Sequence, residues 1–193
     1  MYVFRMCVVS KCACPNVRAS NVVAGFSPRS FESMGTKYHR LPRDCYKGRI
    51  AASFTVCLKK REPFFVDPNI VQLFVDVLKK VAEKHTFFAI YCFMPEHLHL
   101  IFLGRGENSD LLRGIEEFKQ VSGYFLARRY PETKWEKSFH DRILRFEELG
   151  AKVRYVPDNP VRRGLVGNWR EYPFSGSIGL DLERSWKIWQ PSD

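Results

Sequence analysis

Two histidines are separated by a single residue within residues 94–102, a segment of apolar and polar residues. Side chains alternate along a strand, so His97 and His99 would share one face while Leu98 points to the other. Neutral imidazole is a common ligand of divalent metals, and two imidazoles on a rigid strand make half of a first coordination shell. A polar strand face with two solvated histidines has the same pattern, so this pair alone leaves both interpretations open.

A second candidate group lies some sixty residues downstream, where Tyr155 and Asn159 are four residues apart. On a helix this spacing places both side chains on one face. A tyrosine hydroxyl can act as a covalent nucleophile, and an asparagine carbonyl oxygen suits a hard metal ion. The alternative is a helix that ends in an Asn159-Pro160 turn and carries an ordinary surface tyrosine. If Pro157, a mid-helix proline, kinks such a helix, the two side chains need not share a face.

The elements that would position these side chains begin with residues 50–58, an apolar and β-branched run that predicts a buried strand. Asp67 followed by Pro68 is typical of a helix start, and apolar residues at helical spacing continue to position 84. Residues 87–93 and 97–103 read as two further strands, with a short link between them. Strands joined so closely are expected to form an antiparallel hairpin.

An apolar stripe predicts a second helix over residues 110–129, and short strand-like segments follow at 135–139 and 141–146. Residues 147–156 then predict a third helix. The order strand, helix, strand, strand, helix, strand indicates an α+β fold, a ferredoxin-like sandwich. We expect an antiparallel sheet with helices on one face, and an additional C-terminal helix that carries Tyr155.

Several motifs, in this order along the chain, resemble the REP-associated tyrosine transposases. These are single-strand insertion-sequence transposases with a His-hydrophobic-His motif, and the resemblance covers roughly residues 40–178. The matching stretches are Met-Pro-Glu-His97-Leu-His99-Leu, Trp135-Glu-Lys-Ser-Phe-His-Asp-Arg-Ile-Leu-Arg145, Tyr155-Val-x-x-Asn159-Pro-Val-x-x-Gly-Leu-Val166 and Tyr172-Pro-Phe-Ser175.

The resemblance implies a role for each of the four candidate residues. His97 and His99 would be metal ligands, Tyr155 the nucleophile, and Asn159 a polar ligand that completes the metal site. The implied cofactor is Mg or Mn. The implied activity is that of a DNA transposase and single-strand endonuclease, which cleaves and rejoins hairpin-containing single-stranded DNA through a 5′-phosphotyrosine intermediate. The implied partner is hairpin DNA, and the chain would act as a monomer or a homodimer.

The chain contains 31 Lys and Arg and 21 Asp and Glu, which gives a net charge of +10. This positive charge fits a DNA partner. Trp135, Trp169 and Tyr172 are candidates for stacking on unpaired bases. Basic residues along the chain are candidate phosphate contacts: Arg49, Lys60, Arg61, Lys119, Arg128, Arg129, Arg142, Arg145, Arg162 and Arg163.

The remaining composition limits the classes of protein. We expect a tail over residues 1–37, one domain over 38–180 and a tail over 181–193, with translation starting at Met1 or Met34. The chain has no long apolar run for a membrane span, and its six cysteines have no CxxC spacing, which favours a cytoplasmic protein with reduced thiols.

Two other functions compete with a tyrosine transposase. A ferredoxin-like module that binds nucleic acid without catalysis would normally carry a glycine-aromatic motif on its strands, which this chain lacks. A hydrolase that uses metal-bound water would need a richer set of His and Asp ligands.

Overall fold

Five antiparallel strands form one sheet in the order β4-β1-β3-β2-β5. The computed structural model describes residues 40–188, so the tail predicted for residues 1–37 lies outside it. The first four strands have the ferredoxin-like order, and β5 adds to the β2 edge, which confirms the predicted α+β class. The strands are β1 (Ala51–Cys57), β2 (Phe87–Met94), β3 (His97–Gly104), β4 (His140–Leu144) and β5 (Ser175–Ile178).

The hairpin of β2 and β3 is at the centre of this sheet, with β1 on the other side of β3. In its register Met94 pairs with His97, so only two residues make the turn. Leu98 and Leu100 are fully buried on one face of β3, whereas the intervening histidines point to the other face. Strand alternation therefore separates the apolar core from the candidate metal ligands.

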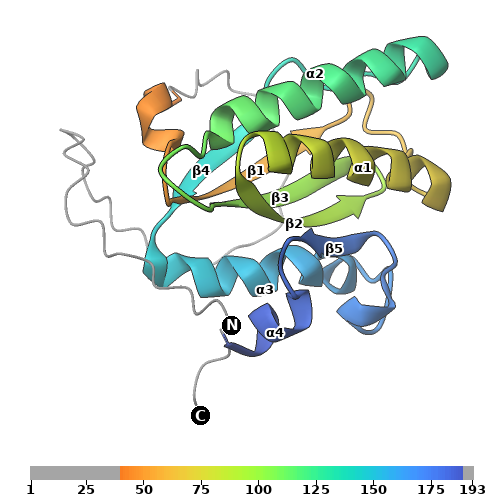
Figure 1. Ribbon diagram of the computed structural model, residues 1–193. Coiled ribbons are helices and arrows are strands. Elements are labelled where there is room, and N and C mark those ends of the chain that lie inside the picture. The colour runs from red at the N-terminus through yellow and green to blue at the C-terminus, as the bar shows by residue number, and fades with distance from the viewer. Residues whose placement is uncertain (1–39, 189–193) are drawn as a thin grey trace. The chain divides into compact units, whose positions relative to one another are not determined.

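Two long helices, α1 (Pro68–Lys84) and α2 (Leu111–Arg129), cover the apolar face of the sheet (Figure 1). Both begin as the sequence predicts, because Asp67 accepts a hydrogen bond from Asn69 N at 2.8 Å and Asp110 accepts one from Arg113 N at 2.9 Å. Their apolar stripes complete a core rich in phenylalanine. Among residues 40–188, no helix combines the length and apolar character needed to cross a membrane.

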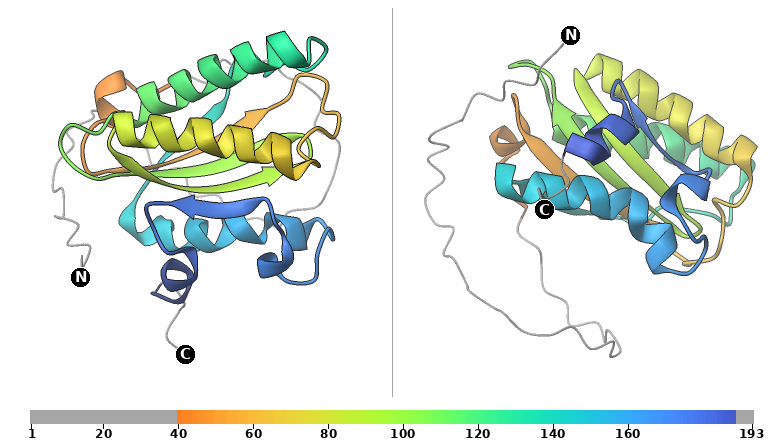
Figure 2. Two further views of the ribbon diagram at one scale, coloured as in Figure 1. Left: turned by 45° about the vertical axis from the view of Figure 1, so that its right-hand side comes forward. Right: turned by 90° about the horizontal axis from the view of Figure 1, so that it is seen from below.

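The opposite face of the sheet is covered by α3 (Phe146–Arg162), the additional helix that carries Tyr155 (Figure 2). This helix packs against β2 and β3, the strands at the centre of the sheet. The short helix α4 (Leu182–Ile188) packs on α3. Two 3-10 turns complete the fold, η1 (Arg43–Tyr46) and η2 (Trp169–Glu171).

Four local features differ from the sequence-based expectation. Residues 135–139 form no strand but only a bridge between Trp135 and Leu58, because the indole packs into the core against Phe65. Helix α3 extends six residues beyond position 156. Strand β5 was not predicted. Part of the segment predicted as a C-terminal tail forms α4, whose Trp186 stacks on Trp169 at 4.8 Å between ring centroids.

Candidate active site

The two histidines of β3 meet on the face of the sheet that α3 covers. Their Nε2 atoms are 2.9 Å apart, and the ring centroids of His97 and His99 are 4.6 Å apart with the planes at 89°. Two nitrogens this close cannot both direct a lone pair at the other without repulsion. Either one nitrogen donates a hydrogen to the other, or a cation is shared between them.

The neighbours of the two rings fix which nitrogen of His97 carries hydrogen and leave two states for His99. The Glu96 carboxylate only accepts, so His97 Nδ1, at 3.2 Å from Glu96 Oε1, carries the hydrogen and Nε2 of neutral His97 has the lone pair. Thr55 Oγ1 lies 3.1 Å from His99 Nδ1, and a hydroxyl can donate or accept. His99 can therefore present to His97 either an N–H or, with Nδ1 donating to Thr55, a second lone pair.

Burial keeps both imidazoles neutral near pH 7. It is the main cause that lowers the pKa of His97 and brings the pKa of His99 to about 3. Electrostatic repulsion from His97, when that ring is protonated, and from Lys152 lowers the pKa of His99 further. Neutral imidazole is the form that binds metal, so burial keeps both side chains in the form that a metal would require.

A divalent cation fits this donor pair. Two adjacent ligands about 2.1 Å from one octahedral ion are about 3 Å apart, which matches the separation of the two Nε2 atoms. Within residues 40–188, no cluster of three His, Cys, Asp or Glu side chains could hold a metal. Further ligands would have to be of another kind, such as an amide oxygen, a water or a phosphate oxygen.

Glu96 also connects the histidine strand to the end of α3. Its Oε1 accepts a hydrogen bond from Arg163, the residue that follows this helix. Burial acts to raise the pKa of Glu96, but the hydrogen bond from Arg163 and the charges of His97 and Arg163 outweigh it, so the pKa is lowered. Glu96 therefore remains a carboxylate that orients His97 and pairs with Arg163.

Tyr155 stands on α3 beside the histidine pair. Its ring centroid lies 6.3 Å from that of His99, with the planes at 77°, and 37% of the residue is exposed. Two cations of the same helix flank the ring: Lys152 Nζ is 4.8 Å and Arg162 Cζ is 5.1 Å from its centroid. The structure thus brings together the predicted nucleophile, the histidine pair and positive charge.

Asn159 is buried, with 7% of the residue exposed. Its Nδ2 donates to the backbone oxygen of Tyr155 at 2.8 Å and to that of Val156 at 3.1 Å. Pro160 has no N–H to offer the Val156 carbonyl, and the Asn159 amide takes its place. Pro157 and Pro160 both lie inside α3, which continues from Phe146 to Arg162, so the helix does not end between Tyr155 and Asn159.

The predicted phosphate contacts divide by position, and a first group lies at the C-terminal end of α3 or follows the end of β1 that pairs with His97. Arg162 flanks Tyr155, and Arg163 pairs with Glu96. Lys60 and Arg61 follow β1 at the end that pairs with His97, and both contact carboxylates, at 3.2 Å to Glu132 and 3.0 Å to Glu136.

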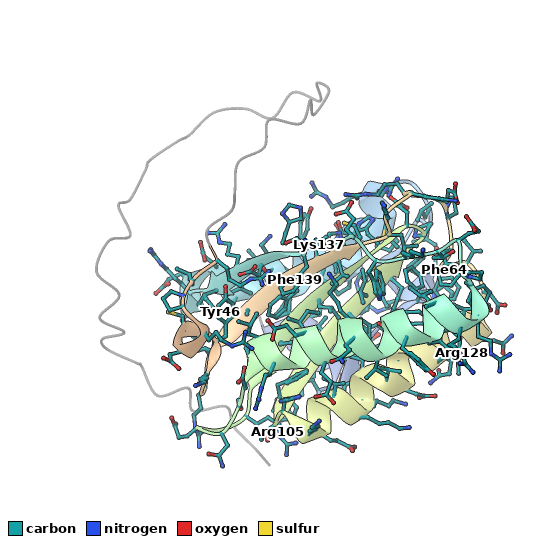
Figure 3. All side chains as sticks on the ribbon, turned by 90° about the horizontal axis from the view of Figure 1, so that it is seen from above. Tyr46, Phe64, Arg105, Arg128, Lys137 and Phe139 are labelled. Atoms are coloured by element: carbon teal, nitrogen blue, oxygen red, sulfur yellow. The ribbon has the colours of Figure 1, made fainter. Side chains whose placement is uncertain are left out.

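A second group of the predicted contacts lies away from the histidine pair. Arg128 and Arg129 end α2 on the opposite face of the sheet, where Figure 3 shows Arg128. Lys119, on the same helix, donates to the backbone oxygens of residues 136–138. Arg49 precedes β1 at its far end, Arg142 lies in the edge strand β4, and Arg145 directly precedes α3, about 15 Å along the helix axis from Tyr155.

The aromatic residues proposed for base stacking belong to the packed interior. Trp169 and Tyr172 are 9% and 8% exposed, and Tyr172 donates its hydroxyl hydrogen to the Phe93 carbonyl at 2.7 Å. Trp135 donates to Ser122 Oγ at 2.9 Å while its ring packs on Phe65. These contacts account for the three rings without a nucleic acid.

Three residues of the site were missed from the sequence. Glu96 lies inside the histidine motif and directly precedes His97. A carboxylate at that position can reach Nδ1 of His97, and this adjacency is the signal in the sequence. Lys152 stands three residues before Tyr155, which places it beside the tyrosine on a helix. Thr55 has no sequence signal, because its position depends on the pairing of β1 with β3.

The chain matches one protein family and shares its fold with a solved structure. The sequence profile of the family described as "Transposase IS200 like" matches residues 46–156. No curated protein sequence matches the chain. A solved structure of a REP-associated tyrosine transposase bound to a REP hairpin aligns with a TM-score of 0.61 and 23% identity, over 73% of this chain and 82% of that one. The two chains therefore share a fold.

Two other solved structures are less similar. A transposase from Deinococcus radiodurans aligns with a TM-score of 0.43 and 18% identity, over 66% of this chain and 97% of that one. A bacterial tRNA(His) guanylyltransferase-like protein in complex with ATP aligns with a TM-score of 0.39 and 10% identity, over 67% of this chain and 70% of that one.

Proposed function

Because this chain belongs to the IS200-like transposase family, we propose that it cleaves and rejoins hairpin-containing single-stranded DNA through a covalent bond to Tyr155. The observation that carries the proposal is the position of this side chain, partly exposed and beside the half-buried histidine pair. The similar REP-associated transposase is bound to a REP hairpin, which supports a hairpin as the substrate here. The net charge of +10 supports a polyanionic partner.

We assign the metal site to His97 and His99, with Asn159 as a further ligand through its amide oxygen. Both hydrogens of its amide nitrogen serve backbone carbonyls of α3, so the oxygen is the atom left for a ligand. Mg or Mn is the expected ion. When bound there, a divalent cation would polarise the scissile phosphate and neutralise the charge that develops on it.

In the cleavage step, Tyr155 Oη attacks the phosphorus atom in line with the 3′ oxygen that leaves. The new bond joins Oη to phosphorus, and the bond from phosphorus to the 3′ oxygen breaks. The phenol loses its proton and the leaving oxygen gains one, which yields a 5′-phosphotyrosine and a free 3′-hydroxyl. Attack by another 3′-hydroxyl reverses the step and restores a phosphodiester, so no ATP is needed.

The other side chains hold this arrangement. Glu96 and Thr55 fix the orientation of the two imidazoles, and the contact between Glu96 and Arg163 ties the end of α3 to the turn before β3. A sheet that binds nucleic acid without catalysis would need an open aromatic face. In residues 40–188, α1 and α2 cover one face and α3 packs on the other, which disfavours that alternative.

The proposal is tested with hairpin oligonucleotides that carry randomised single-stranded flanks and a label at either end. With Mg or Mn, the wild-type protein should become covalently attached to 3′-labelled DNA, because the 5′-phosphate stays on the protein. The 5′-labelled fragment should be released with a 3′-hydroxyl. Tyr155→Phe should form no adduct, whereas Tyr124→Phe, an exposed tyrosine of α2, should behave as wild type.

The metal assignment is tested with the same substrates. His97→Gln and His99→Gln should abolish or strongly reduce adduct formation while the variants still bind the hairpin. An adduct that persists in Tyr155→Phe would remove this residue from the nucleophile's role. Unchanged cleavage in both histidine variants would show that the pair is structural.

A further inference from the structure

Lys152 is placed beside the proposed nucleophile and was not among the residues expected to bind DNA. It precedes Tyr155 by three residues, so one helical turn separates them, and its Nζ is 4.8 Å from the centre of the ring. Arg162 follows seven residues after Tyr155, with Cζ at 5.1 Å from the same ring. All three side chains therefore lie along one stripe of α3.

The charges of these two flanking cations are not neutralised by the described part of the protein. Neither Lys152 nor Arg162 forms an ion pair within residues 40–188, whereas neighbouring cations do: Arg163 pairs with Glu96 and Arg61 with Glu136. Two uncompensated cations next to a nucleophile form a place where an anion is stabilised.

Lys152 also lies near the histidine pair. The Tyr155 ring that its ammonium group contacts lies 6.3 Å from the ring of His99, measured between centroids. The ammonium group is thus close to both the attacking side chain and the proposed metal ligands. A phosphate that contacts Tyr155 and the histidine site would be within reach of Lys152.

We propose that Lys152 is a catalytic residue that binds a non-bridging oxygen of the scissile phosphate, with Arg162 contacting the same phosphate. The inference rests on the proposed function, because it assumes that Tyr155 attacks that phosphate. As the bond from Oη to phosphorus forms and the bond to the 3′ oxygen breaks, negative charge grows on the non-bridging oxygens. Lys152 stabilises this charge as a positive hydrogen-bond donor and neither gives up nor receives a proton.

The test compares Lys152→Met, Lys152→Arg and wild type in the rate of adduct formation at saturating hairpin DNA. Loss of one donor to a transition state typically costs about 10²-fold or more in rate, and that is the effect expected for Lys152→Met. DNA affinity should change far less than the rate. Lys152→Arg should recover most of the activity, since it keeps a cationic donor.

A second substrate carries a methylphosphonate at the cleavage position mapped with the wild-type protein. This linkage has no charge on the scissile group, so the ammonium has less to stabilise. The ratio of wild-type to Lys152→Met rates should therefore be much smaller on methylphosphonate than on phosphate. A lysine that only packs against the tyrosine ring would give the same ratio on both substrates.

Lys80→Met is the matched control, because Lys80 is exposed on α1 across the sheet from the site. Its rate should equal that of wild type. An equal rate for Lys152→Met, or an undiminished ratio on methylphosphonate, would overturn the inference and leave the proposed function standing. Absence of any adduct with wild-type protein and 3′-labelled DNA would overturn the proposed function itself, and the role of Lys152 with it.

Discussion

At the scale of single residues, the histidine pair depends on the groups behind it. The partner of one imidazole nitrogen orients the ring and makes the other nitrogen a better metal ligand. Glu96 accepts from His97 and Thr55 contacts His99, so both rings are turned with Nε2 inward. The motif supplies the ligands, and these two partners decide which nitrogen each ligand offers.

Glu96→Gln should weaken metal binding by about 10- to 100-fold, as removal of such a partner typically does. The amide oxygen can still accept from His97, but the negative charge that supports the imidazole and pairs with Arg163 is lost. Titration with Mn²⁺, followed by electron paramagnetic resonance, measures the effect. Glu83→Gln, at an exposed position of α1, is the control, and equal affinities for the two variants would contradict this role of Glu96.

The stability of the metal-free protein should fall as the pH is lowered from 7 to 5. The pKa values of His97 and His99 are lowered in the folded state, so below about pH 6.5 the unfolded chain takes up more protons than the folded one. For His99 alone the loss by pH 5 is about 2 kcal/mol.

Chemical denaturation at a series of pH values measures this dependence. His99→Gln should show a clearly smaller decrease in the free energy of unfolding than wild type over the same range. Parallel curves for the two proteins would mean that His99 does not remain neutral in the folded state.

At the scale of elements, α3 is unusual because two prolines lie inside it. Pro160 removes the N–H that would bond to the Val156 carbonyl, and the Asn159 amide replaces it. The helix therefore continues far enough to bring Arg162 to the ring of Tyr155 and Arg163 to Glu96. Asn159 thus supports the geometry of the site in addition to its proposed role as a ligand.

A double-mutant cycle tests the helix role of Asn159 separately from metal binding. Asn159→Ala should destabilise the metal-free protein by about 1–3 kcal/mol, because the buried Val156 carbonyl loses its donor. In a Pro160→Ala background the backbone supplies an N–H, so the same change should cost about 1 kcal/mol less. The free energies come from chemical denaturation, and equal costs in both backgrounds would contradict the interpretation.

Two glycines of α2 should respond in opposite ways to alanine. A Cβ at Gly114 would lie 2.5 Å from Phe87, whose ring is buried and stacks on Phe102 at 4.1 Å. Gly114→Ala should therefore cost about 1–3 kcal/mol of overpacking, which exceeds the gain of about 1 kcal/mol in helix propensity.

Gly123→Ala is the matched control, because the nearest atom, in Trp135, would be at an ordinary 3.5 Å. Its helix propensity gain should leave the protein unchanged or more stable. Thermal unfolding compares the three proteins. A higher melting temperature for Gly114→Ala than for wild type would show that α2 can move away from the sheet.

At the scale of the described domain, the two faces of the sheet have separate tasks. The face under α1 and α2 holds most of the apolar core, whereas the face under α3 holds the histidine pair. Most of this organisation could be predicted from the sequence, because periodicity and helix caps are local signals. His97 and His99 could be placed on one face by alternation alone, and Asp67 and Asp110 marked the helix starts correctly.

What could not be predicted depends on contacts between distant segments. Residues around Trp135 were predicted as a strand. In the structure its ring packs on Phe65, seventy residues earlier in the chain, and no local pattern indicates that contact. Pro160 lies inside α3 with the Asn159 side chain donating a hydrogen bond to the Val156 carbonyl. Helix propensities of single residues do not include such a side-chain hydrogen bond. The pairing of Arg163 with Glu96 likewise shows that basic residues in a sequence reveal total charge but not which charges stay available for a phosphate.

The most direct test of the central claim is to identify the residue that carries the DNA. Wild-type protein is trapped with a hairpin oligonucleotide, the adduct is digested with trypsin and a nuclease, and the modified peptide is sequenced by mass spectrometry. We predict a nucleotide attached through its 5′-phosphate to Tyr155. A nucleotide on any other residue, for example the more exposed Tyr124, or attachment through a 3′-phosphate, would contradict the mechanism.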